Sequence, residues 1–202
     1  MAKIKICGLT RECDIGFVNL SQPDFAGFVF AGTKRKIDFK TAKNLSDRLD
    51  KNIKAVGVFV NEALENIIYA LENKIIDIVQ LHGDEDEEFI KILKSKINVP
   101  VIKVFRVNGK ITTIKTSADF VLFDTFSAFE YGGTGETFDW NLIKNCKGNF
   151  FVSGGLNLQN LENVIKNLNP YCIDLSSGVE TNGVKDSCKI LDVIKLTRTL
   201  NF

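Results

Sequence analysis

The sequence predicts a (β/α)8 barrel, or TIM barrel, formed by residues 1–202 as a single compact domain. The first observation is a set of eight short apolar runs rich in Val, Ile and Phe. Longer stretches with helical periodicity separate them, and successive runs begin roughly 20 to 30 residues apart, the length of one βα unit. Strands that alternate with helices favour a parallel sheet. The runs cover residues 3–7, 25–30, 54–60, 77–81, 100–105, 119–124, 149–153 and 171–175.

The segments between the runs have the apolar spacing of amphipathic helices. In residues 61–74 (NEALENIIYALENK) and 156–169 (LNLQNLENVIKNLN), apolar residues recur at i, i+3, i+4 and i+7. The stretch GLTRECD after the first run predicts a helix start with Thr10 as its N-cap. With 202 residues the chain lies near the lower limit of about 200 for an eight-unit barrel, so few insertions are possible.

The composition excludes several classes of function. Lys and Arg number 26 against 25 Asp and Glu, so the net charge of +1 provides no broad basic field for nucleic acid or a membrane surface. No stretch reaches the roughly 18 apolar residues of a membrane span, and the start MAKIKICGLT lacks the apolar region of a signal peptide. The five scattered cysteines form no CxxC pair, which is typical of a reducing compartment. We therefore expect a cytoplasmic protein with no nucleic-acid or membrane partner.

Two titratable residues end predicted strands that lie three places apart around the ring. Cys7 ends the first strand, and Asp124 ends the very apolar sixth strand, where desolvation is expected to raise the pKa of its carboxyl. A thiol acts as a base only as the thiolate, which requires nearby positive charge or dipoles to lower its pKa from about 8.5. The two are a candidate base and acid on opposite sides of a small ligand. The alternatives are a buried structural thiol for Cys7 and an N-cap or salt-bridge role for Asp124.

Two loops rich in glycine and serine follow the seventh and eighth predicted strands. They read SGGLNLQN from residue 153 and SSGVETNG from residue 176. Barrels frequently bind phosphate at these two loops, through backbone N–H groups and helix N-termini, and the serines add hydroxyl donors. We therefore expect a small phosphorylated molecule as the ligand. The candidate phosphate-binding residues are Gly154, Gly155, Ser176, Ser177 and Gly178.

Other residues of the same rim have both a functional and a plain structural explanation. Arg35 offers a planar fork to a carboxylate, or belongs to the solvated run 34–36. His82 lines the pocket or makes a local hydrogen bond, and as the only histidine it cannot form a zinc or other metal site of the usual spacing. Residues 130–140 form a lid over the substrate or a flexible loop. The acidic residues 84–88 are expected to complement a helix dipole and to carry no catalysis.

A series of short motifs from Cys7 to Asp186 resembles the phosphoribosylanthranilate isomerase family of tryptophan biosynthesis. The resemblance spans nearly the whole chain, and its motifs fall on the rim described above. This sequence has Thr33-Lys34-Arg35 where the family often has Ser-Pro-Arg or Ser-Lys-Arg, and Ser153 where the family often has alanine. The motifs are KICGLT, GFVF with TKR, VGVFV, VQLHG, LFDT, GGTG, FDW, SGGL and DLSSGVE with GVKD.

The resemblance implies a cofactor-free isomerase that interconverts an aldose and a ketose. Its reaction is an Amadori rearrangement of N-(5-phosphoribosyl)anthranilate to 1-(2-carboxyphenylamino)-1-deoxy-D-ribulose 5-phosphate. By their places in the motifs, Asp124 looks like the general acid that opens the furanose ring, and Cys7 like the general base that takes the C2′ proton. Arg35 is similar to the arginine that positions the substrate near the anthranilate, and the two glycine-rich loops would hold the phosphate. We expect His82 to line the same pocket.

Two other functions are compatible with the predicted fold. A related sugar-phosphate isomerase with broader activity, for example on a histidine-pathway intermediate, would need a second phosphate site that is not evident in the first half of the chain. A non-catalytic module that binds a phosphorylated ligand would have no use for a matched Cys7 and Asp124. The sequence leaves open whether the chain is a monomer or a homodimer.

Overall fold

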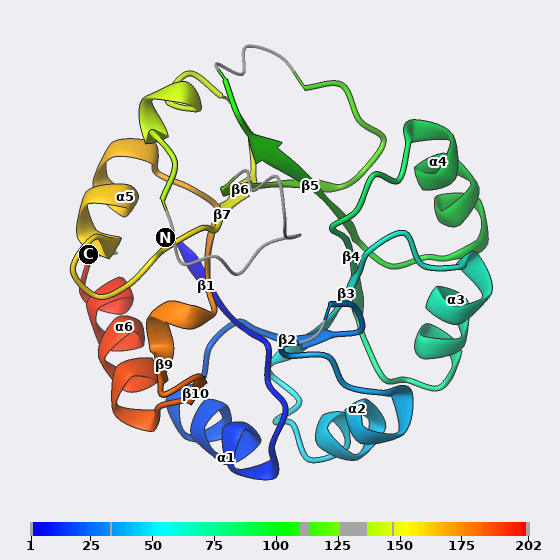
Figure 1. The fold of residues 1–202 in the computed structure, drawn as a ribbon, viewed down its shortest axis with the longest axis horizontal. Helices are drawn as coiled ribbons and strands as arrows, with labels where there is room; N and C mark the ends of the chain where they lie inside the picture. Colours follow the sequence, from blue (N-terminus) through cyan, green and yellow to red (C-terminus); the bar gives the residue numbers. More distant parts are fainter. Residues whose placement is uncertain (1, 33, 110–113, 126–136, 147, 201–202) are drawn as a thin grey trace.

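The computed structural model describes residues 2–32, 34–109, 114–125, 137–146 and 148–200, and its eight long strands close into a barrel (Figure 1). Every neighbouring pair is parallel, and β8 pairs with β1 to complete the ring. The predicted fold class is therefore confirmed, and each predicted strand is present. The strands are β1 (Lys3–Cys7), β2 (Phe25–Val29), β3 (Lys54–Phe59), β4 (Ile78–Leu81), β5 (Val101–Val107), β6 (Phe120–Thr125), β7 (Phe150–Val152) and β8 (Cys172–Leu175).

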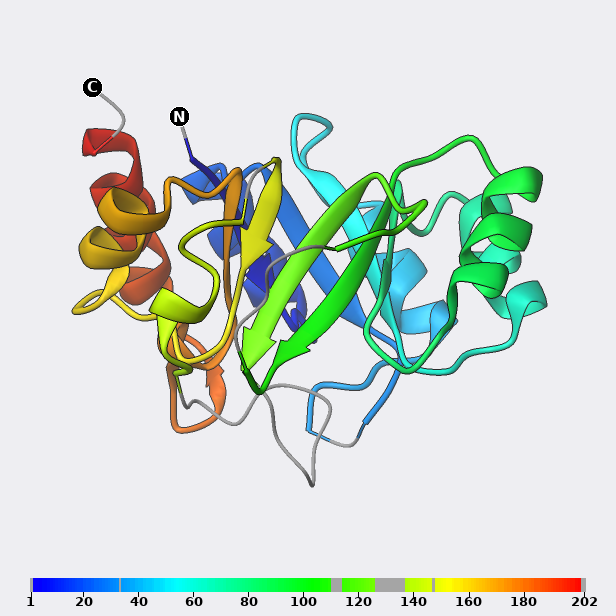
Figure 2. The ribbon, with the colours of Figure 1, turned by 90° about the horizontal axis from the view of Figure 1, so that it is seen from above.

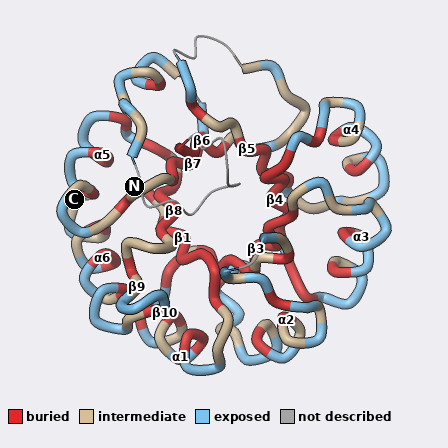
Figure 3. The backbone as a smooth tube through the Cα atoms, viewed as in Figure 1, coloured by how far each residue is buried: buried red, intermediate tan, exposed pale blue. Residues whose placement is uncertain are grey.

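Helices surround the ring, with their buried faces toward the strands and their outer faces exposed (Figure 3). Both stretches expected to be amphipathic helices contain one, α3 and α5. Within the described residues the α-helices are α1 (Glu12–Ser21), α2 (Phe39–Ser46), α3 (Leu64–Glu72), α4 (Glu87–Lys96), α5 (Leu161–Leu168) and α6 (Ser187–Thr199). The shorter elements are the 3-10 helices η1 (Trp140–Leu142) and η2 (Ser177–Val179) and the hairpin of β9 (Glu180–Thr181) with β10 (Val184–Lys185).

The connection from β5 to β6 differs from a regular βα unit. Its described residues, 108–109 and 114–119, form no helix. The sequence NGKITTIKTSAD gives the reason, since glycine and a run of β-branched residues disfavour helix. A cavity of about 470 Å³ lies there on the outside of β6, lined in part by Ile114, Phe120, Phe123 and Phe150.

The start of α1 also differs from the expectation. The helix begins at Glu12, and its N-cap is Arg11 rather than Thr10. Asp14, in the first turn, accepts hydrogen bonds from the backbone N–H groups of Thr10 and Arg11, each at 3.0 Å. A carboxylate inside the first turn thus reaches back to the backbone N–H groups at the helix entrance, as the N3 side chain does in a capping box.

The barrel interior is apolar in its lower part and polar near the C-terminal ends of the strands. Side chains alternate between the two faces of a strand, so Asp124 points inward above Leu122, two residues before it. Asp174 stands in the same relation to Cys172. Polar groups thus sit on an apolar floor. That floor consists of Phe25, Val56, Ile78, Ile102, Val104, Leu122, Phe151 and Cys172.

Among the described residues, no helix is long and apolar enough to cross a membrane.

Removing a ring from the apolar floor should destabilise the barrel strongly. Phe151 is 1% exposed and packs against Phe25 and Phe120 at ring-centroid distances of 5.6 Å. We expect Phe151→Ala to lower the free energy of unfolding by about 3–5 kcal/mol, because it leaves a cavity that the closed sheet cannot collapse. Leu20, which is 81% exposed, is the control, and Leu20→Ala should change this free energy by less than about 0.5 kcal/mol. Equal effects of the two substitutions in urea unfolding would contradict this description of the interior.

Candidate active site

The predicted site residues lie at the C-terminal ends of the strands or directly after them. Because all eight strands run parallel, these ends form one rim, which is where barrels place their active sites. Figure 2 shows the arrowheads of β5 and β6 pointing to this rim, with the β9–β10 hairpin on the same side. Cys7 ends β1, and Asp124 lies at the end of β6, three strands away around the ring. The expected opposition of thiol and carboxylate across the ring is present.

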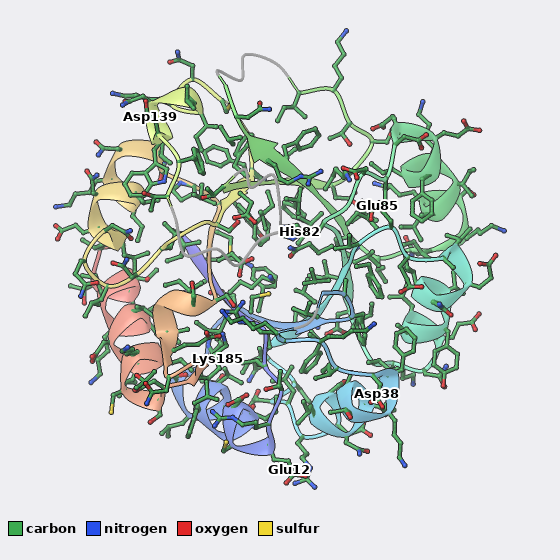
Figure 4. The ribbon with its side chains drawn as sticks, viewed as in Figure 1. Glu12, Asp38, His82, Glu85, Asp139 and Lys185 are labelled. Carbon is green, nitrogen blue, oxygen red and sulfur yellow. The ribbon has the colours of Figure 1, made fainter. Side chains whose placement is uncertain are left out.

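Asp124 is buried in a hydrogen-bonded chain of polar side chains. Its Oδ2 lies 3.0 Å from Nε2 of His82, and Nδ1 of the same ring lies 3.0 Å from Nε2 of Gln80. Its Oδ1 accepts a hydrogen bond from the backbone N–H of Thr125 at 2.9 Å. Figure 4 shows His82 within the ring of strands. The structure thus joins two residues, His82 and Asp124, that the sequence could place only on a common rim.

The expectation of a raised pKa for Asp124 is wrong. Burial does raise the pKa of this carboxyl, but hydrogen bonds from His82, Ser153 and the Thr125 backbone outweigh burial and hold the pKa below its ordinary value. The apolar sequence before Asp124 indicated the burial, whereas the compensating donors come from other strands. In the absence of a ligand, Asp124 is therefore ionised at neutral pH.

Cys7 is buried, and two cations lie close enough to affect its ionisation. Burial raises the pKa of the thiol, while the charge of Lys5 and, more weakly, that of Lys185 lower it. The net result is a pKa above the ordinary value. Positive side chains close to the thiol therefore oppose the effect of burial.

Lys5 is the functional-site residue that sequence reasoning missed most clearly. Its side chain is completely buried, and Nζ donates a hydrogen bond to Oδ2 of Asp174 at 2.8 Å. The residues face each other in the β1–β8 register. Lys5 precedes Cys7 by two positions, so both point to the same face of β1. The alternation of KIKIC places Lys5 and Cys7 on one face of the strand, but the local sequence does not show that this face is the closed interior of the barrel.

Arg35 is held beside Cys7 by a carboxylate of the protein itself. Its Nε and Nη2 donate to the two oxygens of Glu180 at 2.7 and 2.8 Å. The stem of Arg35 packs over Gly8, where a Cβ would lie 2.4 Å from Cδ and where φ is +80°. Glycine is required at position 8 on both counts. The expected carboxylate partner of Arg35 is, in this structure, Glu180.

Lys185 connects this ion pair to the end of β8. Its Nζ donates to Glu180 Oε1 at 2.6 Å and to the backbone oxygen of Ser176 at 2.9 Å. The Ser176 hydroxyl in turn donates to the backbone oxygen of Cys7 at 3.0 Å. Lys185 lies beside the ring next to β1 (Figure 4). The loop after β8 is thereby fixed to the strand that carries the thiol.

The two candidate phosphate loops lie against each other. A Cβ on Gly178 would lie 1.9 Å from the backbone oxygen of Leu156, so only glycine permits this close approach of the loops after β7 and β8. Ser177 and Gly178 lie in η2, a short extra helix of the kind that completes phosphate sites in barrels. Gly154 and Gly155 have φ values of +89° and +60°. The predicted loops are therefore adjacent, as a shared anion site requires.

The acidic residues 84–88 are not a uniform solvated group. Asp86 is the N-cap of α4, as expected for its place at a helix start. Glu85, however, is buried and accepts a hydrogen bond from Nζ of Lys103 at 2.7 Å, so the expectation of a merely dipole-complementing carboxylate is wrong for this residue. Lys103, the partner of Glu85, lies on β5, so the sequence around Glu85 does not reveal this ion pair.

The predicted lid over residues 130–140 lies largely outside the described residues, since the structure describes this stretch only from residue 137 onward. In the described part of the chain, no group of three or more His, Cys, Asp or Glu side chains is arranged to hold a metal ion.

The arrangement places a thiol and a carboxylate on opposite sides of one rim of the barrel, with the paired glycine loops at its edge. Comparison with known families agrees with this geometry: a family model described as "N-(5'phosphoribosyl)anthranilate (PRA) isomerase" matches residues 4–196. The chain belongs to this family.

Members of the PRA isomerase family are similar to this chain over nearly their full lengths. An N-(5'-phosphoribosyl)anthranilate isomerase from Endomicrobium trichonymphae is 58% identical over 200 residues, which cover 99% of this chain and 100% of the relative. The structure of phosphoribosyl anthranilate isomerase from Thermus thermophilus has a TM-score of 0.87 and 29% identity, with 98% and 99% of the two chains covered. A further PRA isomerase structure, in complex with reduced 1-(o-carboxyphenylamino)-1-deoxyribulose 5-phosphate, has a TM-score of 0.81 and 31% identity, with 98% and 100% covered.

The ionised state of Asp124 should be visible in the acid stability of the protein. The folded-state pKa lies below the unfolded value of about 3.9, so the carboxylate stabilises the fold above that pH and loses this contribution as the pH falls through the folded-state pKa. We expect the difference in unfolding free energy between the wild type and Asp124→Asn to be largest near neutral pH and to shrink below about pH 4. Urea unfolding at a series of pH values measures it, with the exposed Asp192→Asn as control. A constant difference down to about pH 3 would contradict the assignment.

Proposed function

We propose that this member of the PRA isomerase family converts N-(5-phosphoribosyl)anthranilate to 1-(2-carboxyphenylamino)-1-deoxy-D-ribulose 5-phosphate, as a step of tryptophan biosynthesis. The observation that carries the proposal is the pair of Cys7, the last residue of β1, and Asp124, the second-last residue of β6, on opposite sides of one rim. An isomerisation that moves one proton from carbon needs an acid and a base in just such positions. No cofactor takes part in this scheme, since the substrate is both the electron donor and the acceptor.

The first step in the proposed mechanism is acid-catalysed ring opening. Asp124 gives a proton to the furanose ring oxygen, the bond between that oxygen and C1′ breaks, and the anthranilate nitrogen forms a Schiff base with C1′. Asp124 is ionised before the substrate binds, so it must take up a proton as the complex forms, while Nε2 of His82, 3.0 Å from Oδ2, holds the carboxyl group in place. His82 thus lines the pocket and serves as the hydrogen-bond partner of the acid.

The second step is removal of the C2′ proton by Cys7. The C–H electron pair forms the C1′–C2′ double bond, and the electrons of the C=N bond return to nitrogen, which gives an enolamine. Tautomerisation of this enolamine yields the aminoketose. Arg35, which covers Gly8 beside Cys7, would position the anthranilate part of the substrate, and Glu180 would fix the orientation of Arg35.

The two alternative functions have less support. A sugar-phosphate isomerase for a larger bis-phosphate substrate requires a second anion site, and the buried cation Lys103 near β4 already pairs with Glu85. A non-catalytic binding module does not require the Asp124–His82–Gln80 chain, whose burial costs free energy unless each group is paired. One copy of the chain carries both Cys7 and Asp124, so we expect a monomer or a homodimer to be active. Free cysteines throughout the chain favour a cytoplasmic location.

Loss of either catalytic group should abolish most turnover without unfolding the protein. We expect Cys7→Ala and Asp124→Asn each to lower kcat by about 10²–10⁴-fold in a fluorescence assay of substrate consumption. The exposed matched controls Cys188→Ala and Asp192→Asn should retain wild-type kcat. Expression of the wild-type chain should also restore growth without tryptophan to a bacterium that lacks this isomerase. Near-wild-type turnover in either folded variant would remove the corresponding residue from the mechanism.

The glycine contact between the two phosphate loops should affect substrate binding more than turnover. Gly178→Ala forces the Leu156 carbonyl away and distorts the site, and the loss of one hydrogen bond to a phosphate costs about 1.5–3 kcal/mol. We therefore expect KM to rise by about tenfold or more, with a smaller change in kcat. Gly16→Ala is the matched control, because a Cβ at Gly16 meets no atom within 4 Å. An unchanged KM in Gly178→Ala would argue against phosphate binding at these loops.

A further inference from the structure

The acid–base mechanism leaves the buried ion pair of Lys5 and Asp174 without a role. Lysine is almost never fully buried unless it is paired, and Lys5 is 0% exposed. Apolar residues of similar volume are often at least as stabilising as a buried ion pair. The fold alone therefore does not account for a lysine at this position, and its surroundings indicate what it does.

Lys5 lies next to the base of the proposed reaction. It precedes Cys7 by two residues on β1, so both side chains enter the barrel interior from one strand. The register of β1 with β8 places Asp174 opposite Lys5, with 2.8 Å between Nζ and Oδ2. Asp174 Oδ1 is buried without a hydrogen-bond partner in the described structure, so Lys5 is the partner that holds this carboxylate.

The other positively charged groups around Cys7 are already paired with the same carboxylate. Lys185 on β10 is committed to Glu180 and Ser176, and burial lowers its pKa. Arg35, on the loop after β2, is held by the same Glu180.

Across the barrel, Asp124 on β6 raises the pKa of Asp174 and His82 after β4 lowers it. Burial acts to lower the pKa of Lys5, but Asp174 and Cys7 together raise it above its ordinary value, so Lys5 stays protonated.

We propose that Lys5 is a positioning residue for the catalytic thiolate: its buried ammonium group, held in place by Asp174, is the counter-charge that allows Cys7 to lose its proton inside the barrel. This inference rests on the proposed function, because it assigns to Lys5 a task for the base of that reaction. The ammonium group stays protonated throughout and transfers no proton to the substrate.

The two partners of the ion pair should have opposite effects on Cys7. Lys5 stabilises the thiolate, whereas the negative charge of Asp174 opposes it. Removal of both charges leaves the buried thiol with only the weaker effect of Lys185, while removal of Asp174 alone leaves Lys5 to pair with the thiolate. A purely structural role of the pair predicts no such difference in sign.

The test measures the ionisation of Cys7 without substrate, by the rate at which iodoacetamide alkylates it at each pH. Peptide-resolved mass spectrometry separates Cys7 from the other four cysteines. In Lys5→Met/Asp174→Asn, the pH midpoint of alkylation should rise by at least about one unit, a tenfold or greater loss of thiolate near neutral pH. In Asp174→Asn the midpoint should fall below that of the wild type, and in Lys5→Arg it should stay close to it.

A second buried ion pair provides the matched control. Lys103 and Glu85 are joined at 2.7 Å, and Lys103 alternates with the inward-facing Ile102 and Val104 on β5, so this pair lies on the outer face. Lys103→Met/Glu85→Gln removes a comparable pair and should leave the alkylation midpoint of Cys7 unchanged. Circular dichroism confirms that each variant is folded. Where the double variant at Lys5 does not fold, the direction of the shift in Asp174→Asn decides the question.

Activity measurements separate this inference from the proposed function. If Lys5 sets the thiolate population, kcat/KM of the double variant should fall at neutral pH and recover as the pH rises, with a smaller change in KM. An unchanged midpoint in the folded double variant, or a raised midpoint in Asp174→Asn, would overturn the role of Lys5 even if Cys7 proves to be the base. A fully active Cys7→Ala would instead overturn the proposed function, while the alkylation result would still report on the effect of Lys5 on the thiol.

Discussion

The pairing of β1 with β8 is the constraint on which the site depends, because it closes the barrel and joins the two ends of the chain. It places Lys5 opposite Asp174, residues separated by 169 positions, and it brings the end of β1 to the loop that contains Ser176. Without closure, the thiol would lie on an edge strand, away from Lys185 and from the glycine-rich loop after β8. The interior polar groups therefore form one site only because the sheet has no edges.

The ionisation states in this site follow from which groups each strand supplies. Asp124 and Cys7 are both buried, and burial alone would keep both protonated. Asp124 is ionised because His82, Ser153 and the Thr125 backbone donate to it, whereas burial still dominates at Cys7 despite Lys5. The roles proposed above for Asp124 and Cys7 require the reverse at the moment of reaction, with a proton on Asp124 and none on Cys7. In that proposal, substrate binding supplies the change.

Much of the fold could be predicted because burial is periodic along the chain. All eight strands fall where apolar runs of the right length occur, and α3 and α5 lie within the amphipathic stretches. The errors arose where a residue's environment is set by distant neighbours. Glu85 is buried because β5 supplies Lys103. The start of α1 is a local exception, since its N-cap is Arg11 rather than Thr10. The described residues between β5 and β6 form no helix, in keeping with the β-branched residues of this stretch.

By itself the sequence determined the barrel, the rim on which Cys7, Asp124 and the glycine loops lie, and the resemblance to PRA isomerases. These depend on strand order and on local pattern, which a single chain records directly. Only the tertiary structure decided the partners: Asp174 for Lys5, His82 for Asp124, and Glu180 for Arg35. Hydrogen bonds and charges act through space over a few ångströms, and residues far apart in sequence reach that range only after the ring has closed.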